Sequence, residues 1–287
     1  TENVECILYL REGLYPEGLR TPERQTHKWY CEDANDRLYR IEYEQLDDRR
    51  HIFETNRIIS GVTRITVKDA TKVVNHPTED DFVLIGHHSK VAFVDDDKSA
   101  TRRMLAPSRI GIESIIVIRV ISNDGRPKAE DRISDDVFGI GTDTVNIVTQ
   151  TRACSNGKFQ FIPATGEHIV NGVLNVHVPI NFKGITIAQA HGHARMAAMN
   201  IISSLSNIKK HIYVLQNDVD FDGATAFAFI NGKASLIKDS FIGFAMIQVH
   251  ELGHNLGLHH SGHRSGIKPS IEEYNDHTCM MGNPMYA

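Results

Sequence analysis

Hydrophobic and polar positions alternate in several short segments of the first third of the chain, which is typical of half-buried β-strands. The predicted strands are residues 4–10, 37–43, 58–68, 81–85 and 91–94. The pattern therefore predicts a small, antiparallel, all-β domain over residues 1–104.

The pattern changes in the remainder of the chain. Residues 114–122 form a β-branched run that predicts a strand buried on both faces, as in a largely parallel sheet. Apolar positions at helical spacing predict a long helix over residues 185–205. We further expect a short helix over 129–137 and strands over 145–153, 158–162, 167–170, 173–178, 211–215, 225–230 and 233–237. The fold class expected for residues 105–287 is α+β, with a mixed twisted sheet and long helices.

Charge and hydropathy exclude some kinds of partner. The chain has 287 residues, of which 41% are hydrophobic and 23% charged, and its net charge of −5 gives no electrostatic case for binding nucleic acid or anionic membrane. The longest apolar run, residues 114–121, is interrupted by Arg119 and is far shorter than the ~20 residues that cross a bilayer. We therefore expect a globular protein without a membrane span.

The most informative segment is H-E-L-G-H-N-L-G-L-H-H, residues 250–260, within a helix predicted over 241–258. Positions i and i+4 share one face of a helix, so His250 and His254 can bind one metal ion with Glu251 beside them. Gly257 can end the helix with a positive φ and turn the chain back. His260 then becomes the third ligand, and the spacing favours it over His259, which we expect to face solvent or to lie behind the ligands.

Three neutral imidazoles suit a tetrahedral Zn²⁺ with one open position for water, although they suit other divalent ions too. The metal lowers the pKa of that water to about 7. Glu251 is placed to take a proton from the water and to pass it to a leaving amine. The segment therefore predicts hydrolysis of peptide bonds in a protein or peptide substrate.

The segment resembles the HExxHxxGxxH signature of the metzincin zinc endopeptidases. Within that clan, three further segments resemble the gametolysin (autolysin) family: V-F-G at 137–139, C-S-N-G-K at 154–158 and E-Y-N-D-H-T-C-M-M-G at 273–282. The resemblance implies a metzincin-like protease domain over residues 105–287. The preceding β domain is then a pro-segment, a substrate-binding module or a structural partner, and the sequence leaves these open.

The resemblance also implies roles for residues around the zinc site. Met281, with Met280 as the alternative, is expected in a tight turn beneath the metal. Some clan members have a metal-bound tyrosine two residues after this methionine, but Asn283 stands there, and Tyr286 is the substitute. An extended substrate is expected on the free edge of a strand formed by Ala224, Thr225, Ala226, Phe227, Ala228 and Phe229.

The expected substrates and location follow from the resemblance as well. The expected substrates are hydroxyproline-rich glycoproteins of an extracellular wall or matrix. The protein itself is expected to be secreted. The chain begins at Thr1 without a leader and ends six residues after Met281, so we expect a processed or incomplete form. The competing hypothesis is a noncatalytic wall or matrix protein that keeps a metzincin fold for binding.

Four cysteines allow two disulfides in three connectivities, and our hypothesis is Cys6–Cys31 with Cys154–Cys279. The alternative for Cys31 is a thiolate that caps the zinc in a latent precursor.

Two further motifs have weaker interpretations. Asp218, Asp220 and Asp222 resemble the first half of a calcium loop, but Phe229 stands where a bidentate acid belongs, so an acidic turn is the preferred interpretation and Ca²⁺ the alternative. The dibasic pair Arg102-Arg103 ends a charged linker and is a hypothetical processing site.

Overall fold

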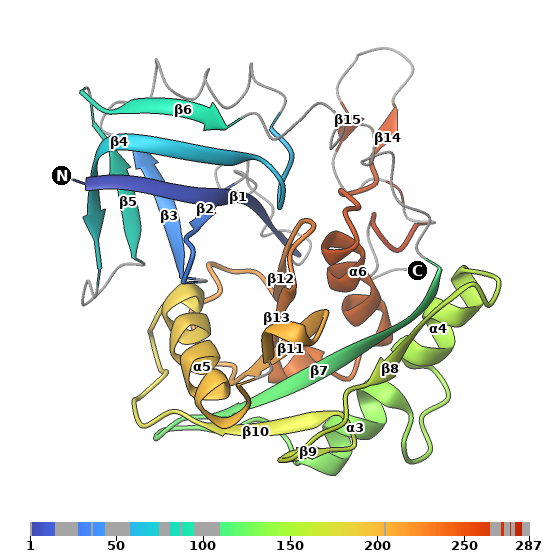
Figure 1. Ribbon diagram of the computed structural model, residues 1–287. Coiled ribbons are helices and arrows are strands. Elements are labelled where there is room, and N and C mark those ends of the chain that lie inside the picture. Colours follow the sequence, from blue (N-terminus) through green and yellow to red (C-terminus); the bar gives the residue numbers. More distant parts are fainter. Residues whose placement is uncertain are drawn as a thin grey trace.

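The computed structural model describes residues 2–14, 28–35, 37–43, 58–74, 81–86, 88–94, 110–203, 205–264, 271–272, 276 and 279–282. The fold is mixed α+β and rich in sheet, with a small β-barrel beside a helix-flanked sheet (Figure 1). Among the described residues, no helix is long and apolar enough to cross a membrane. The linker and the Arg102-Arg103 pair lie outside the described residues.

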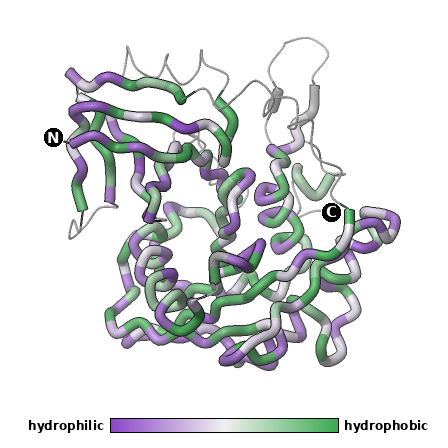
Figure 2. Tube along the Cα trace, viewed as in Figure 1, coloured by the Kyte–Doolittle hydropathy of each residue, from purple (hydrophilic) through white to green (hydrophobic). Residues whose placement is uncertain are grey.

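The barrel consists of the N-terminal strands. Their bounds are β1 (Glu2–Leu14), β2 (Lys28–Glu32), β3 (Leu38–Tyr43), β4 (Arg64–Val73), β5 (Phe82–Ile85) and β6 (Lys90–Val94). Neighbouring strands follow the order β6-β4-β5-β3-β2-β1, and an added β4–β1 pairing closes the ring. Hydrophilic and hydrophobic residues are interspersed along these strands (Figure 2), and alternate side chains of β1, from Val4 to Leu10, are buried. The predicted alternation is present in these strands, but β2 was not predicted. The purely antiparallel arrangement expected for this domain is wrong, because β3 and β5 are parallel.

The first predicted disulfide is confirmed and the second is wrong. Cys6 and Cys31 are bonded and join β1 to β2 inside the barrel core. This bond excludes the alternative in which Cys31 caps a metal as a thiolate. Cys154 and Cys279 are free thiols, the first exposed at the end of a helix and the second in a turn.

The disulfide is expected to stabilise the barrel. Its partners are 25 residues apart, and closing a loop of that length in the unfolded chain corresponds to about 3 kcal/mol. The double variant Cys6→Ala/Cys31→Ala should lose about that much free energy of unfolding in a urea titration. Cys154→Ala, which removes an exposed free thiol, is the matched control and should change little; equal stability of both variants would contradict the prediction.

The second half of the chain forms a sheet with helices on both faces. Its strands are β7 (Gly111–Ile121), β8 (Phe159–Pro163), β9 (Ile169–Val170), β10 (Val173–His177), β11 (Lys210–Leu215), β12 (Ala226–Phe229) and β13 (Ala234–Lys238). The order is β12-β13-β11-β7-β10-β9, and β8 pairs with β7. Strands β13, β11, β7 and β10 are parallel, whereas β12 is antiparallel to β13. A separate two-stranded ribbon joins β14 (His263–Arg264) and β15 (Ile271–Glu272).

Helices cover the two faces of this sheet unequally. The long helix α5 (Ile187–Ile201) packs on one face through its buried alanines. The other face is covered by α3 (Glu130–Phe138), α4 (Ile147–Cys154) and α6 (Ala245–Asn255). The described residues also form two 3₁₀ turns, η1 (Leu205–Asn207) and η2 (Asp239–Phe241). The central strand β7 is buried on both faces, as predicted.

One predicted strand is wrong. Residues 145–153 were expected to be extended, but residues 147–153 belong to helix α4. Asn146 caps this helix: its side chain accepts hydrogen bonds from the amides of Val148 and Thr149, and the Thr149 hydroxyl accepts one from the Asn146 amide in return. This capping box outweighs the β propensity of Val145, Ile147 and Val148.

Strand β1 is longer than predicted and continues from the barrel into the second sheet. Its last residues pair antiparallel with β12, from Arg11 opposite Phe229 to Leu14 opposite Ala226. All thirteen strands from β1 to β13 therefore belong to one hydrogen-bonded sheet. The domain boundary expected at residues 104 and 105 lies outside the described residues and stays a prediction.

Candidate metal centre

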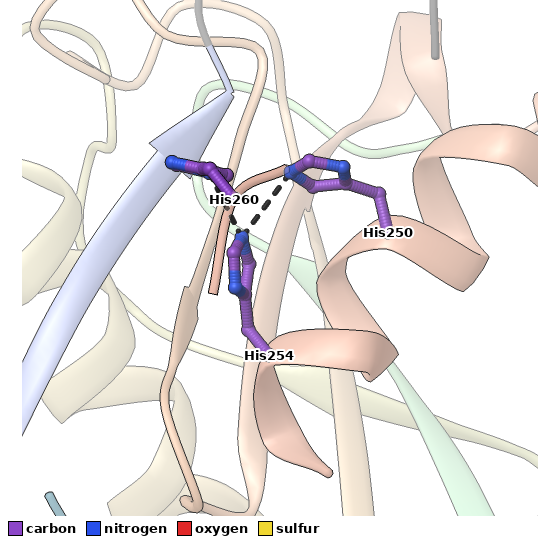
Figure 3. A group of neighbouring side chains, drawn as sticks. All are labelled: His250, His254 and His260. Carbon is purple, nitrogen blue, oxygen red and sulfur yellow. Dashed lines mark hydrogen bonds between the residues drawn. The ribbon is translucent and has the colours of Figure 1, made fainter. Parts of the chain in front are cut away.

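Three histidine side chains converge at the end of helix α6. The Nε2 atom of His254 lies 3.2 Å from Nε2 of His250 and 3.1 Å from Nε2 of His260 (Figure 3). The potential ligand atoms of the three residues all lie within 4.8 Å of one another. His250 and His254 are one helical turn apart and both are fully buried. The structure thus brings together the three ligands that the sequence predicts.

Two of the rings are oriented by backbone carbonyl groups. Nδ1 of His250 lies 2.7 Å from the carbonyl oxygen of Met280, and Nδ1 of His254 lies 2.8 Å from that of Leu258. A carbonyl oxygen only accepts, so each Nδ1 carries the proton and each Nε2 keeps its lone pair. Burial lowers the pKa of His254 well below its usual value, and its histidine neighbours lower it further. Neutral rings with converging lone pairs fit a divalent ion such as Zn²⁺.

A glycine turn returns the third histidine to the site. Gly257 has a φ of 95°, which favours glycine, and its amide donates to the carbonyl of His254 at 2.8 Å. A Cβ at this position would lie 2.5 Å from Oδ1 of Asn231. Asn231 itself donates its amide to the His254 carbonyl at 2.9 Å. The end of α6 is therefore fixed against the β12–β13 turn, and this contact determines where His260 lies.

A buried polar network fixes the same helix end to the sheet, and sequence reasoning missed it. The side-chain amide of Asn255 donates through Nδ2 to the carbonyls of Phe229 and Ala234, both at 3.0 Å. Its Oδ1 accepts a hydrogen bond from the Ser235 hydroxyl at 2.8 Å. The Lys210 ammonium donates to the Asn255 carbonyl at 2.7 Å. Local pattern gave no signal for this network because its partners come from three separate elements.

Glu251 lies beside the histidines and is fully buried. Neither carboxylate oxygen has a hydrogen-bond partner among the described residues. Burial raises the pKa of Glu251 well above its usual value, and the negative charge of Glu12 raises it further. A carboxyl group with a raised pKa in a site of this kind is suited to accept and release a proton near neutral pH.

A tight turn over residues 279–282 lies beneath helix α6, which carries His250 and His254. The amide of Gly282 donates to the carbonyl of Cys279 at 2.9 Å, so Met280 and Met281 are the central residues of the turn. Met281 is buried, and its sulfur contacts the backbone of α6 so closely that a Cβ on Gly253 would be 2.3 Å from it. Met281 therefore packs under the helix, while Met280 contributes its carbonyl. Asn283 and Tyr286 lie outside the described residues.

Comparison with known protein families agrees with this geometry. Residues 115–286 match the family model of gametolysin peptidase M11, which is more than half of the chain. The chain belongs to the gametolysin peptidase M11 family. It is therefore a metallopeptidase, and its substrate is a protein or peptide. No curated protein and no solved structure matches the chain.

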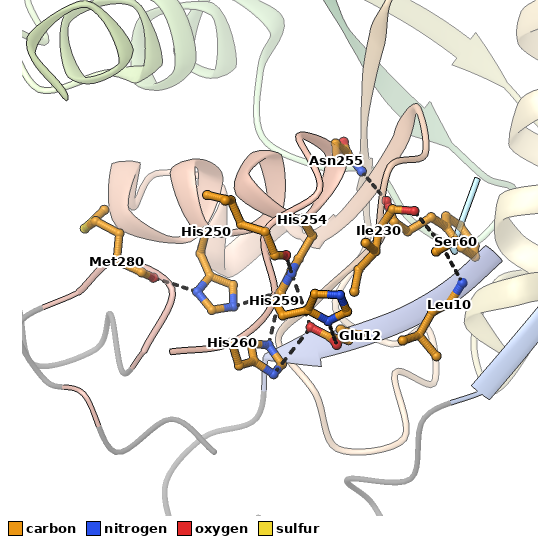
Figure 4. A network of polar contacts seen from close by, with 12 residues as sticks. Leu10, Glu12, Ser60, Ile230, His250, His254, Asn255, His259, His260 and Met280 are labelled. Atoms are coloured by element: carbon orange, nitrogen blue, oxygen red, sulfur yellow. Dashed lines mark hydrogen bonds and ion pairs between the residues drawn. The ribbon is translucent and has the colours of Figure 1, made fainter. Parts of the chain in front are cut away.

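The gametolysin-family match begins within β7 and leaves out the N-terminal strands, yet one residue of β1 reaches the histidines. Oε1 of Glu12, on β1, lies 3.1 Å from Nδ1 of His259, and its Oε2 lies 3.3 Å from Nδ1 of His254 and 3.5 Å from Nδ1 of His260 (Figure 4). The Glu12 side chain is only 3% exposed, whereas His259 is 63% exposed. No local signal identifies Glu12, because only the pairing of distant strands brings it here.

The predicted free edge for substrate is wrong in this structure. Strand β12 covers Ala226–Phe229 and is paired on both sides, with β13 and with β1. Thr225 precedes the strand, and both its amide and its hydroxyl donate to the carbonyl of Leu14. The backbone groups that were expected to meet a substrate are therefore already used by β1.

The three aspartates of the hypothetical calcium loop do not converge. Asp222 forms an ion pair with Lys28 at 3.3 Å, and Oδ1 of Asp220 accepts from the Asp222 amide at 2.8 Å. Within the described part of the chain, the only cluster of His, Cys, Asp or Glu that is close enough to hold a metal is that of the three histidines. The segment containing Asp218 is therefore an acidic turn, and Ca²⁺ is unsupported.

Proposed function

We propose that this protein is a zinc-dependent endopeptidase with a metzincin-like catalytic part over residues 105–287. The observation that carries the proposal is the convergence of three Nε2 atoms next to a buried carboxyl group with a raised pKa. His250, His254 and His260 would hold the ion, and Glu251 would be the general base. A three-histidine set leaves a coordination position open for water, unlike the four protein ligands of most structural zinc sites.

When bound, zinc supplies an acidified water and polarises the scissile carbonyl. Glu251 accepts the proton of the attacking water on its carboxylate and then donates it to the nitrogen of the leaving amine. Its burial supports both steps, because a carboxylate with a raised pKa is a stronger base and its acid form persists closer to neutral pH. The backbone carbonyls of Met280 and Leu258 keep two of the rings aimed at one point.

We further propose that the enzyme is secreted and acts on proteins of an extracellular wall or matrix, including hydroxyproline-rich glycoproteins. The support for this part is the family to which the chain belongs. A direct comparison of hydroxyproline-rich and ordinary peptides as substrates tests it. Equal rates on both kinds of peptide would argue against the substrate preference.

The test of the chemistry is cleavage of a mixed peptide library by the intact protein. We expect cleavage that is lost after chelation and restored by Zn²⁺, with the metal content measured in each sample. Parallel additions of Co²⁺ and Mn²⁺ show which ion supports activity. A zinc-loaded protein that binds peptides but cuts none of them would instead support a noncatalytic binding protein.

A further inference from the structure

A cavity of about 80 Å³ lies on the face of the sheet that α5 covers. Tyr9 and Leu38 line it from the barrel strands, whereas His191, Tyr213 and Phe229 line it from α5, β11 and β12. Helix α6 packs on the opposite face of the sheet, and none of the residues that line the cavity belongs to it. The cavity is therefore separate from the three histidines of the metal centre.

Two buried rings at this cavity have polar atoms without a hydrogen-bond partner. His191 is 5% exposed and Tyr213 is fully buried. Among the described residues, neither Nε2 of His191 nor the hydroxyl of Tyr213 has a partner. The two rings meet edge to face, with their centroids 4.6 Å apart. Buried polar atoms are normally paired, and leaving one unpaired costs free energy, so both atoms point to a ligand that the cavity would hold.

The neighbouring ring of His211 is satisfied within the chain, in contrast to that of His191. Its Nε2 lies 3.1 Å from the carbonyl oxygens of both Leu205 and Ile208, so its proton is already used. Burial lowers the pKa of His191 to about 3 and that of His211 to about 4. Both rings are thus neutral at neutral pH, and of these two rings His191 is the one whose Nε2 can bind a ligand.

The charged residues that line the cavity favour an anion. Arg195 follows His191 by one helical turn on α5, and Lys233 lies in the β12–β13 turn, whereas Glu32 carries the one negative charge among the described lining residues. Lys233 is exposed and the other two are half-buried, so the charges lie nearer to solvent than the two rings. Burial is the main cause of the low pKa of His191, and the positive charge of Arg195 lowers that pKa further. Two positive charges against one negative charge give the cavity a positive potential.

The remaining walls of the cavity are apolar. The side chains of Leu38, Met199 and Leu205 line it together with the rings of Tyr9 and Phe229. An apolar cavity of about 150 Å³ holds benzene, which has six carbon atoms, so the smaller cavity suits about three to five non-hydrogen atoms. The ligand that fits is an anion with two acceptor atoms at one end and a short apolar group at the other.

We propose that this cavity is a binding site for a small monocarboxylate, with the carboxylate at His191 and Tyr213 and the alkyl group against the apolar walls. The two carboxylate oxygens accept hydrogen bonds from the Tyr213 hydroxyl and from Nε2–H of His191, and the positive charge of Arg195 balances the charge of the ligand. Each neutral ring has one proton to donate, which matches the two oxygens. The site does not depend on the zinc chemistry proposed above and gives the protein a second ligand.

The cavity and the metal centre share one turn of the chain. Phe229 and Ala234 line the cavity, and their carbonyl oxygens accept the two hydrogen bonds from Asn255 at the end of α6. Gly232 also lines the cavity, and its carbonyl accepts from Lys210. A ligand in the cavity therefore packs against the segment that fixes the end of α6. Hydrogen exchange at residues 229–234 should slow when the ligand binds.

The first test is a titration of the intact, zinc-loaded chain with propionate, followed through the NMR signals of the histidine and tyrosine rings. Propionamide, which has the same shape without the charge, is the matched control ligand, and inorganic phosphate is a second anion. We expect propionate to bind with a Kd of about 1 mM, as suits a ligand of five non-hydrogen atoms, and propionamide at least about tenfold more weakly. Equal binding of propionate and propionamide, tighter binding of phosphate, or a cavity that holds only water would each overturn the proposal.

The second test removes single groups of the site. Tyr213→Phe keeps the ring and deletes an unpaired buried hydroxyl, so without ligand it should be at least as stable as the wild type in a urea titration. Its affinity for propionate should nevertheless fall about tenfold, the usual effect of losing a hydrogen bond to a charged group. Arg195→Gln should weaken propionate binding and leave propionamide binding unchanged. His193→Ala, at an exposed position of the same helix, is the matched control and should change neither affinity.

The same variants separate this site from the metal centre. A propionate bound to zinc would keep its affinity in Tyr213→Phe and would lose it when the metal is removed by a chelator. That result would sink the proposed carboxylate site while leaving the zinc chemistry intact. Binding that persists after chelation, weakens in Tyr213→Phe and slows exchange at residues 229–234 supports the site whether or not the protein cleaves peptides.

Discussion

Replacing Glu251 by Gln is expected to lower kcat/KM of the zinc-loaded protein by about 10²- to 10⁴-fold, the usual contribution of a general acid–base group. Glutamine keeps the volume of the buried side chain but cannot take a proton from water or return it to the leaving amine. Peptide cleavage over a range of substrate concentrations gives the ratio.

The matched measurement is zinc content. Glu251 is not one of the three converging ligands, and a neutral amide in a fully buried position avoids the cost of an uncompensated charge. The variant should therefore bind zinc at least as well as the wild type. If it binds zinc and cleaves at the wild-type rate, Glu251 is not the base, and another group must carry the proton.

The second large effect is expected from His254→Ala. His254 is central in the cluster, because its Nε2 lies within 3.2 Å of Nε2 of both His250 and His260. Loss of groups that only orient zinc ligands already costs about 10- to 100-fold in affinity, so loss of a ligand should cost at least about a hundredfold. Competition with a chromogenic chelator measures the zinc affinity without reference to catalysis.

His193→Ala is the control, since His193 is an exposed histidine on α5, away from the cluster. It should leave zinc affinity unchanged. The cavity left by His254→Ala also loosens packing beneath the site, so a thermal unfolding curve of the metal-free protein should accompany the titration. A folded His254→Ala protein with wild-type zinc affinity would place the metal elsewhere.

Local features of the sequence were sufficient for the metal cluster. The i, i+4 spacing fixes His250 and His254 on one face of any helix, and the helix formed as α6 because its other positions, such as Ile247 and Leu252, are apolar and buried. Gly257 then provides the positive φ that the return of His260 requires. These constraints lie within about eleven residues, and the contact of the Asn231 amide with the end of α6 then fixes where His260 lies.

The wrong predictions have two other origins, one local and one that depends on distant contacts. The strand expected over residues 145–153 failed because a capping box at Asn146 outweighed β propensity, and the Cys154–Cys279 bond failed because the fold leaves both thiols free. The free substrate edge failed because β1 fills it. The last two depend on which distant segments meet, a property that composition and periodicity do not contain.

The sequence by itself determined the chemistry: three imidazoles and a carboxyl group at fixed helical and turn spacing, together with the alternation that builds the barrel and the buried strand β7. Only the tertiary structure decided which distant residues reach this cluster. Glu12 meets His254 and His260 through a strand pairing that spans more than 200 residues, and such a pairing is selected by the closure of the whole sheet. Spacing along the chain constrains neighbours within one element, whereas register between distant strands is set by the side chains and backbone groups that both must bury together.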